Sequence, residues 1–198
     1  MITYTNRKGD IYYLCCTRAK NGRVRYIFRK EPKDTVVKTM PQGYEIRENV
    51  NGIVSLARKQ TLLLRENEIR IVEQAVAQHP ESELYRLEYR ANRIVIHEQT
   101  NSGIKDILKM FAEQAGVSVA DSPVMQKGID TKAAQMADYQ AVVRFTLRDK
   151  QARLFNAERF CFLGGIDNWI TIGHLERLES LVKIIIPTLG TEAFYELF

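Results

Sequence analysis

DIYYLCCTRAKNGRVRYIFRK (residues 10–30) holds two runs of aromatic and β-branched residues on either side of Asn21-Gly22. Asn-Gly is a strong hairpin signal, because both residues tolerate a positive φ. Successive side chains of a strand alternate between its faces. The apolar positions of the returning run are Val24, Tyr26 and Phe28. The basic positions of the other face are Arg23, Arg25 and Arg29, with Ile27 among them. The segment predicts a hairpin with one apolar and one basic face.

A second segment, MPQGYEIRENVNGIVSLARKQ (residues 40–60), has the same kind of pattern. Pro41 fixes φ at the first central position of a turn that Gly43 closes, and Asn51-Gly52 turns the chain between two short strands. With the first hairpin, this predicts a four-stranded antiparallel meander. We interpret the dense turn residues of this segment as scaffold and not as a site.

Hydrophobic periodicity predicts helices and further hairpins in the remaining sequence. The helices are expected over residues 65–79, 103–115 and 174–187, the hairpins over residues 85–98 and 139–163, and a short strand over residues 169–172. The predicted fold class is α+β, with antiparallel β-hairpins or meanders and about three helices packed on the sheet.

The segment VSVADSPVMQKGIDTKAAQMAD lacks sustained periodicity and is expected to be a loop or linker over residues 116–137. It separates an N-terminal α+β region with the basic hairpins (residues 1–115) from a C-terminal hairpin plus helix (residues 138–198). The C-terminal part is either a second domain or part of the same one.

Charge is unevenly distributed along the 198 residues, whose formal net charge is +5. Residues 1–60 hold 13 Lys or Arg against 5 Asp or Glu, whereas the remainder holds 16 against 19. This asymmetry indicates an anionic partner for the first third of the chain, or an electrostatic contact between the halves.

Several classes are disfavoured by composition. No apolar run approaches the roughly 18 residues of a membrane-spanning helix, and the first ten residues lack the apolar centre of a signal peptide. A cytoplasmic bacterial protein without a membrane partner is expected. Three cysteines without a Cys-x-x-Cys motif, and three histidines without a short-spaced partner, predict no disulfide framework, zinc site or cofactor.

Four segments resemble a family of uncharacterised bacterial proteins. They are TNRKGDIYYL (5–14), NGRVRYIF (21–28), MPQGYEIRENVNGIVSLARK (40–59) and RFTLRDKQARLFNAERFCFLGGIDNWI (144–170). The group opens with Thr-Asn-Lys/Arg-Lys-Gly and an aromatic strand, and continues with Pro-x-Gly-Tyr/Phe-Glu-Ile-x-Glu-Asn. The resemblance implies no activity and no catalytic residue, because the group has no assigned function.

Patterns that support catalysis are weak. A metal-dependent nuclease needs an acid-x-Lys core on a strand, and Glu31-Pro32-Lys33 and Asp130-Thr131-Lys132 match only this core in expected loops. Cys161 lies between two Phe, which is typical of a core cysteine and not of a nucleophile paired with His174. Gly164-Gly165 is interpreted as a turn. No catalytic or metal-binding residue is predicted.

The basic hairpin remains the candidate binding surface. Its residues are Arg18, Lys20, Arg23, Arg25, Arg29 and Lys30. Interleaved aromatics offer stacking surfaces beside phosphate-binding cations; the alternative is a solvated basic face with the aromatics in the core. Two function classes stay open. The preferred one is a non-catalytic binding module for nucleic acid or an acidic protein; the other is a hydrolytic enzyme whose site is assembled from scattered residues.

Overall fold

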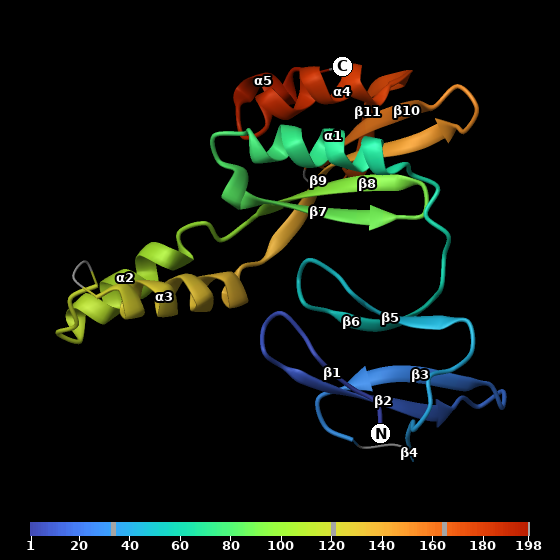
Figure 1. The fold of residues 1–198 in the computed structure, drawn as a ribbon, viewed down its shortest axis with the longest axis vertical. Coiled ribbons are helices and arrows are strands. Elements are labelled where there is room, and N and C mark those ends of the chain that lie inside the picture. The colour runs from blue at the N-terminus through green and yellow to red at the C-terminus, as the bar shows by residue number, and fades with distance from the viewer. Residues whose placement is uncertain (33–34, 120–121, 164–165, 198) are drawn as a thin grey trace. The chain divides into compact units, whose positions relative to one another are not determined.

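The structure, a computed structural model, describes residues 1–32, 35–119, 122–163 and 166–197 (Figure 1). The chain forms two compact units, each made of two separate segments. Unit 1 comprises Met1–Lys59 and Thr100–Asp138, and unit 2 comprises Gln60–Gln99 and Tyr139–Phe198. Each unit combines antiparallel strands with helices, so the predicted α+β class is confirmed.

The chain passes between the units after Lys59, Gln99 and Asp138, so residues 116–137 lie inside unit 1. The prediction that this segment is a loop is wrong, because α3 (Pro123–Met136) fills most of it. The Ser122 hydroxyl caps the helix by accepting a hydrogen bond from the N–H of Met125 at 3.3 Å. Among the described residues of α3 only two, Ile129 and Ala133, are buried, so no helical stripe marked it in the sequence.

Unit 1 contains a four-stranded sheet with β2 (Ile11–Arg18) at its centre. One edge of β2 pairs with β3 (Val24–Arg29), and the other edge is shared by β1 (Thr3–Thr5) and β4 (Thr35–Val36). A separate two-stranded sheet is formed by β5 (Tyr44–Glu48) and β6 (Val54–Arg58). Both predicted hairpins therefore form, but the predicted four-stranded meander is wrong.

Three hairpin turns of unit 1 share one geometry. In each, a glycine donates its N–H to the carbonyl three residues earlier: Gly9 to Asn6, Gly22 to Ala19 and Gly52 to Asn49. The three glycines have φ between 75° and 85°, whereas Asn21 and Asn51 do not have a positive φ. The turns are thus closed by a single left-handed glycine, not by a two-residue Asn-Gly pair.

The second segment of unit 1 forms a pair of packed helices, α2 (Ile104–Gln114) and α3. The Lys105 ammonium lies 2.6 Å from the Asp130 carboxylate across this pair. The helix predicted over residues 103–115 is confirmed.

Unit 2 is built on a five-stranded antiparallel sheet of order β11-β10-β9-β8-β7. The strands are β7 (Tyr85–Arg90), β8 (Arg93–Gln99), β9 (Tyr139–Asp149), β10 (Leu154–Leu163) and β11 (Ile166–Arg177). The hairpins predicted over residues 85–98 and 139–163 are confirmed.

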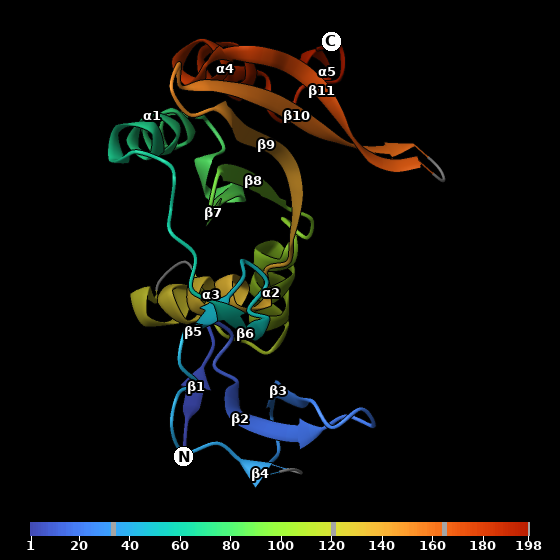
Figure 2. The ribbon, with the colours of Figure 1, turned by 90° about the vertical axis from the view of Figure 1, so that its right-hand side faces the viewer.

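Three helices lie on one face of this sheet: α1 (Glu66–Ala77), α4 (Leu178–Ile185) and the short α5 (Glu192–Tyr195) (Figure 2). Two short 3-10 helices, η1 (Ser82–Leu84) and η2 (Ile186–Thr188), complete the unit. The core between helices and sheet consists of fully buried aliphatic and aromatic side chains, among them Val72, Ile94, Val143, Phe145, Phe155 and Leu178. The predicted helix over residues 65–79 corresponds to α1.

The helix predicted over residues 174–187 begins four residues too early. The strand β11 continues to Arg177, which pairs with Leu154 of β10, and α4 begins at Leu178. The Asn156 amide oxygen accepts the N–H of Leu175 at 3.0 Å, and Leu175 has a φ of 51°. Pairing with the preceding strand β10 therefore overrides the local helical pattern of apolar residues.

A buried ion pair joins the start of α1 to the turn between β9 and β10. The Glu68 carboxylate accepts hydrogen bonds from Arg153 at 2.8 and 2.5 Å, and also accepts the backbone N–H of Arg65 at 2.8 Å. The side chains of Glu68 and Arg153 are only 5% and 15% exposed. Loss of either partner would leave a buried charge, which typically costs about 3–5 kcal/mol.

Substitution at Gly173 tests the close approach of α4 to the sheet. A Cβ at this position would collide with Cδ2 of Leu181, so we expect Gly173→Ala to lower the free energy of unfolding by about 1–3 kcal/mol. In α3, Gly128 has open space around it, and Gly128→Ala is expected to stabilise by up to about 1 kcal/mol. Urea denaturation followed by circular dichroism measures both. Equal effects of the two substitutions would contradict the packing described.

Candidate nucleic-acid interface

The outer end of the β2–β3 hairpin extends beyond its neighbouring strands. β1 pairs with β2 at residues 11–13 and β4 pairs at residues 15–16, so Thr17 and Arg18 have only β3 beside them. Both faces of this two-stranded ribbon meet solvent: Val24 is 50%, Tyr26 38% and Ile27 43% exposed. Neither face is buried in a core, although the sequence alone predicted an apolar inner face.

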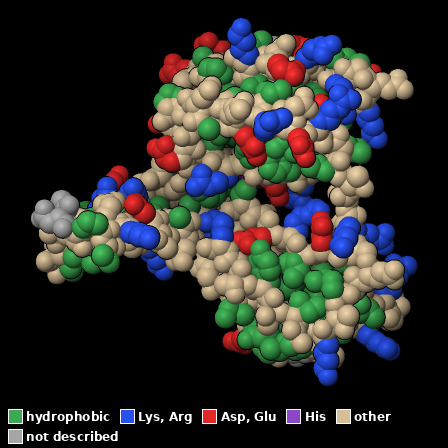
Figure 3. Space-filling view, in the orientation of Figure 1, with side chains coloured by type: hydrophobic (Ala, Val, Ile, Leu, Met, Phe, Trp, Pro, Cys, Tyr) green, Lys and Arg blue, Asp and Glu red, His purple; other side chains and the backbone are tan. Residues whose placement is uncertain are grey.

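The six predicted binding residues separate into two groups. Arg18, Lys20, Arg23 and Arg25 are exposed and gather around the turn, whereas Arg29 is half-buried and, with Lys30, lies at the base of the ribbon. Register puts Arg25 opposite Thr17 on one face and Arg18 opposite Val24 on the other. Figure 3 shows Lys and Arg side chains at the lower right, where this hairpin ends. The cations thus surround the ribbon and do not line a single face.

Lys30, at the base of the ribbon, has both an ion pair and an aromatic contact. Its ammonium lies 2.9 Å from the Asp10 carboxylate and 5.9 Å from the centre of the Tyr12 ring. The hydrogen bond that the Lys30 ammonium donates to the Asp10 carboxylate raises the pKa of Lys30 above its usual value. Residues 11–30 contain no Asp or Glu. The cations around the turn therefore have no carboxylate within their own hairpin.

The aromatic side chains of the hairpin differ in accessibility. Phe28 is half-buried opposite the fully buried Leu14, so it belongs to the small core of unit 1. Tyr26 is exposed, and its ring centroid lies 6.2 Å from that of Tyr44 in a tilted arrangement. Only Tyr26 of these two rings offers a surface to a ligand.

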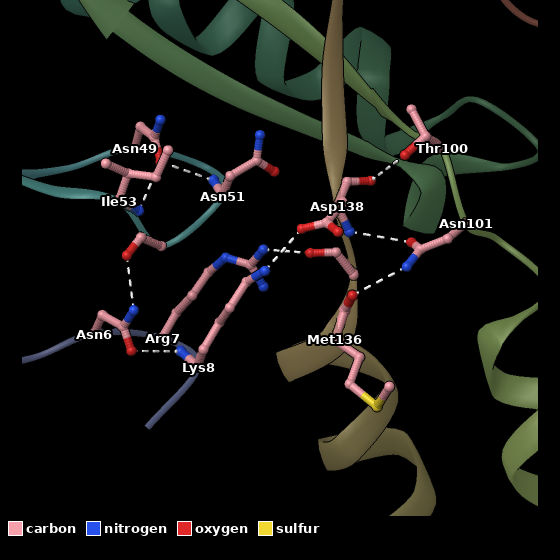
Figure 4. A network of polar contacts seen from close by, with 12 residues as sticks. Asn6, Arg7, Lys8, Asn49, Asn51, Ile53, Thr100, Asn101, Met136 and Asp138 are labelled. Carbon is pink, nitrogen blue, oxygen red and sulfur yellow. Dashed lines mark hydrogen bonds and ion pairs between the residues drawn. The ribbon is translucent and has the colours of Figure 1, made fainter. Parts of the chain in front are cut away.

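The hairpin is held in unit 1 by a network of polar contacts around the β1–β2 turn (Figure 4). The Arg7 guanidinium donates hydrogen bonds to the carbonyl oxygens of Ala134 at 2.6 Å and Ala137 at 2.5 Å, at the end of α3. The C-terminal end of a helix carries carbonyls without intrahelical partners. A guanidinium donates hydrogen bonds to them, and its positive charge interacts favourably with the negative end of the helix dipole. Arg7 therefore joins residues that are 127 and 130 positions apart in the sequence.

Lys8 extends the same contact. Its ammonium lies 2.7 Å from the Asp138 carboxylate. The Asp138 carbonyl accepts the backbone N–H of Thr100 at 2.8 Å, and its own N–H donates to the side chain of Asn101 at 3.0 Å. The start and the end of the second segment of unit 1 are thus fixed to each other and to the β1–β2 turn (Figure 4).

The turn is also bonded to the β5–β6 hairpin. The Asn6 amide donates to the carbonyl of Gly52 at 2.7 Å. The Glu48 carboxylate accepts the N–H of Arg7 at 2.7 Å and the hydroxyl of Tyr4 at 2.8 Å, and the latter bond raises the pKa of Tyr4. The motifs Thr-Asn-Arg-Lys-Gly and Glu-Ile-x-Glu-Asn therefore meet in space. This contact supports the interpretation of residues 40–60 as scaffold.

A second polar surface, on the sheet of unit 2, was not found from the sequence. Arg144 of β9 donates two hydrogen bonds to Glu158 of β10, at 2.7 and 2.6 Å, and its guanidinium lies 4.3 Å from the centre of the Trp169 ring. These bonds lower the pKa of Glu158 despite its burial. The residues come from three strands, and only the strand register brings them together.

The weak catalytic patterns gain no support from the fold. Asp130-Thr131-Lys132 lies within α3 and not in the expected loop. Cys161 is buried in β10 opposite Asn168, and His174 is exposed near the other end of β11. Lys33 and Gly164-Gly165 lie outside the described residues. Within the described ranges, no group of three or more His, Cys, Asp or Glu is placed to hold a metal ion.

Among the described segments, no helix is both long and apolar enough to cross a membrane. No protein-family model matches the sequence, and comparisons with curated proteins and with solved structures give no match. The chemistry of this chain's own surfaces is therefore the basis for inferring a function.

Removal of the Arg7 side chain tests the polar network. We expect Arg7→Ala to lower the free energy of unfolding of unit 1 by about 1–3 kcal/mol, because the partly buried bond to the Ala137 carbonyl and the exposed bond to the Ala134 carbonyl are both lost. Hydrogen exchange of the α3 amides should accelerate. The exposed Arg18→Ala is the control and should change stability by less than about 0.5 kcal/mol. Unchanged α3 exchange in Arg7→Ala would contradict this role.

Acid unfolding tests the Arg144–Glu158 pair. The depressed pKa of Glu158 means that its contribution is present above the ordinary carboxyl pKa of about 4.3 and is lost as the pH falls towards the lower folded-state value. Glu158→Gln should therefore be less stable than wild type at neutral pH, and the difference should shrink below about pH 4. Urea titrations across pH measure this, with Glu176→Gln, an exposed carboxylate of β11, as control. A difference independent of pH would contradict the assignment.

Proposed function

We propose that the protein is a nucleic-acid-binding module and that the β2–β3 ribbon is its contact surface. The observation that carries this proposal is a two-stranded ribbon whose outer end exposes four cations, Arg18, Lys20, Arg23 and Arg25, with no carboxylate in residues 11–30. Cations placed around a narrow ribbon contact phosphates on either side of it. Neutralised phosphates release counterions, which makes such binding favourable and salt-dependent.

Single strands are the favoured form of nucleic acid. Tyr26 exposes part of its ring between Arg25 and Ile27, and unstacked bases bind aromatic faces irrespective of sequence. Arginine outnumbers lysine around the turn, and the planar guanidinium forms bidentate hydrogen bonds with phosphate. An acidic protein would use the charge of the ribbon but not the exposed ring, so nucleic acid accounts for more of the surface.

Charge reversal in the ribbon tests the proposal. Arg23→Glu/Arg25→Glu changes two exposed side chains and should weaken binding of a labelled mixed-sequence single strand at least 10-fold, measured by fluorescence anisotropy. The matching Arg23→Ala/Arg25→Ala variant should reduce the slope of log affinity against log salt concentration by about 1.4, because each phosphate contact on a single strand contributes about 0.7. Adding Arg29→Glu should weaken binding further.

The control variant is Arg70→Glu/Lys183→Glu, which makes the same change in net charge on exposed positions of α1 and α4. It should retain most of the affinity. Equal loss in both variants would mean that only net charge matters and would contradict a defined contact surface. Binding to a polyglutamate peptide, without binding to any nucleic acid at low salt, would overturn the proposal in favour of an acidic protein.

A further inference from the structure

The two faces of the sheet in unit 2 have opposite chemistry. The face that carries Ile94, Phe145 and Phe155 packs against the helices in the apolar core. On the other face, strand register aligns Glu88, Val95, Arg144, Glu158 and Thr171 in one row across all five strands. Within the described residues, the helices of unit 2 pack on the first face only, in a single core cluster. The second face, here called the polar sheet face, has no helix of unit 2 upon it.

The polar sheet face is rich in arginine. Its arginines are Arg86, Arg90, Arg93, Arg144 and Arg148, and its carboxylates are Glu88, Glu158 and Asp167. Arg90 lies 2.7 Å from Glu88, and Arg144 binds Glu158. Arg93 has no ion pair among the described residues, and Arg148 is exposed and acts on the same Glu158 carboxylate that Arg144 binds. Positive charge therefore exceeds negative charge on this face.

Arg144 is fixed as a flat plate. Its Nε and one terminal nitrogen donate hydrogen bonds to Glu158, and its Cζ lies over the Trp169 ring, 4.3 Å from the ring centre. The side chain remains 21% exposed. A guanidinium held in this way has a fixed orientation, and guanidinium planes are among the groups on which unstacked bases stack.

Aromatic rings continue from this plate along β10 and β11. The Phe160 ring lies edge-on to Trp169 at 5.2 Å and 4.7 Å from Phe162, and all three belong to the polar sheet face. Phe162 is 47% exposed. Two partly accessible planar groups, the Phe162 ring and the Arg144 guanidinium, thus lie on one face with the cations Arg93 and Arg148.

We propose that the polar sheet face is a second binding surface for single-stranded nucleic acid. Bases stack on Phe162 and on the Arg144 plate, while phosphates contact Arg93 and Arg148. The ligand class rests on the proposed function, but the residues are independent of the β2–β3 ribbon. Single strands are required because stacking needs bases that are free of a duplex. A purely anionic protein would not use the aromatic rings.

Trp169 is the only tryptophan of the chain, so its fluorescence reports this surface directly. The experiment titrates the full-length protein with an unlabelled single strand of about eight nucleotides, a length within the usual range for such surfaces. We expect saturable quenching of Trp169 emission. Phe162→Ala should weaken the affinity about 5- to 150-fold, since stacking on one aromatic side chain contributes about 1–3 kcal/mol. Arg93→Ala and Arg148→Ala should each lower the salt slope by about 0.7.

Two controls make the test specific. Phe111→Ala removes a ring of α2 that is 59% exposed and should leave the quenching curve unchanged. A duplex of the same length should quench far less than the single strand. Absence of quenching at low salt, or quenching that Phe162→Ala, Arg93→Ala and Arg148→Ala leave unchanged, would overturn the inference. Equal quenching by polyglutamate would overturn it as well, because only charge would then be recognised.

The ribbon variant separates this inference from the proposed function. Arg23→Glu/Arg25→Glu should keep at least part of the Trp169 quenching by the short strand while it loses anisotropy binding of the longer one. If the ribbon variant loses the anisotropy signal and the wild type shows no quenching, the second surface is refuted and the proposed function stands. If the wild type shows quenching and the ribbon variant changes neither signal, the role of the ribbon is refuted and the second surface stands.

Discussion

The contact of Arg7 with the end of α3 is the constraint on which unit 1 depends. The unit consists of two segments separated by forty residues of the other unit, and little buried apolar surface is available to hold them together. Its buried apolar side chains among the described residues are few and mostly small, whereas the large core cluster belongs to unit 2. They are Leu14, Cys15, Val54, Val119, Ile129, Ala133 and Ala137. Charged hydrogen bonds from Arg7 and Lys8 therefore replace part of the hydrophobic stabilisation that a larger core would supply.

This construction explains why the outer end of the ribbon is exposed to solvent. The β1–β2 turn, the β5–β6 hairpin and the end of α3 meet around Asn6, Arg7 and Glu48, close to the start of β2. The far end of β2 pairs with β3 alone. An isolated two-stranded hairpin is marginally stable in water, so the ribbon needs its anchored base. Its outer end can then expose Val24 and Tyr26, which a buried sheet would have enclosed.

Local chemistry made the hairpins predictable, since Asn-Gly turns and alternating strands depend on neighbouring residues. The same signals did not predict that each turn has one glycine with a positive φ and no Asn with a positive φ. In two of the turns the side-chain oxygens of Asn6 and Asn49 accept backbone N–H groups and stabilise this conformation. The α3 helix was missed because few of its residues are buried. The strand predicted over residues 169–172 was too short, because pairing with β10 extends β11 to Arg177 against a local helical pattern. The basic residues of the ribbon were visible in the sequence. The group around Arg144 was not, because its members come from strands whose register is fixed by the whole sheet.

The β2–β3 ribbon and the polar sheet face differ in how far their arginines are paired with carboxylates. This difference gives each a separate part in the proposed function. On the ribbon, cations around the turn lack a carboxylate in the same hairpin, so their field extends into solvent until salt screens it. On the polar sheet face, Arg90 and Arg144 are already paired with Glu88 and Glu158, so their charge is largely satisfied at short range. An approaching polyanion is therefore attracted mainly by the ribbon. In the proposed second surface the Arg144 guanidinium, oriented by Glu158 and Trp169, instead contributes stacking, which depends less on salt than the attraction of unpaired charges does. A protein with both would capture a strand by charge and retain it by stacking.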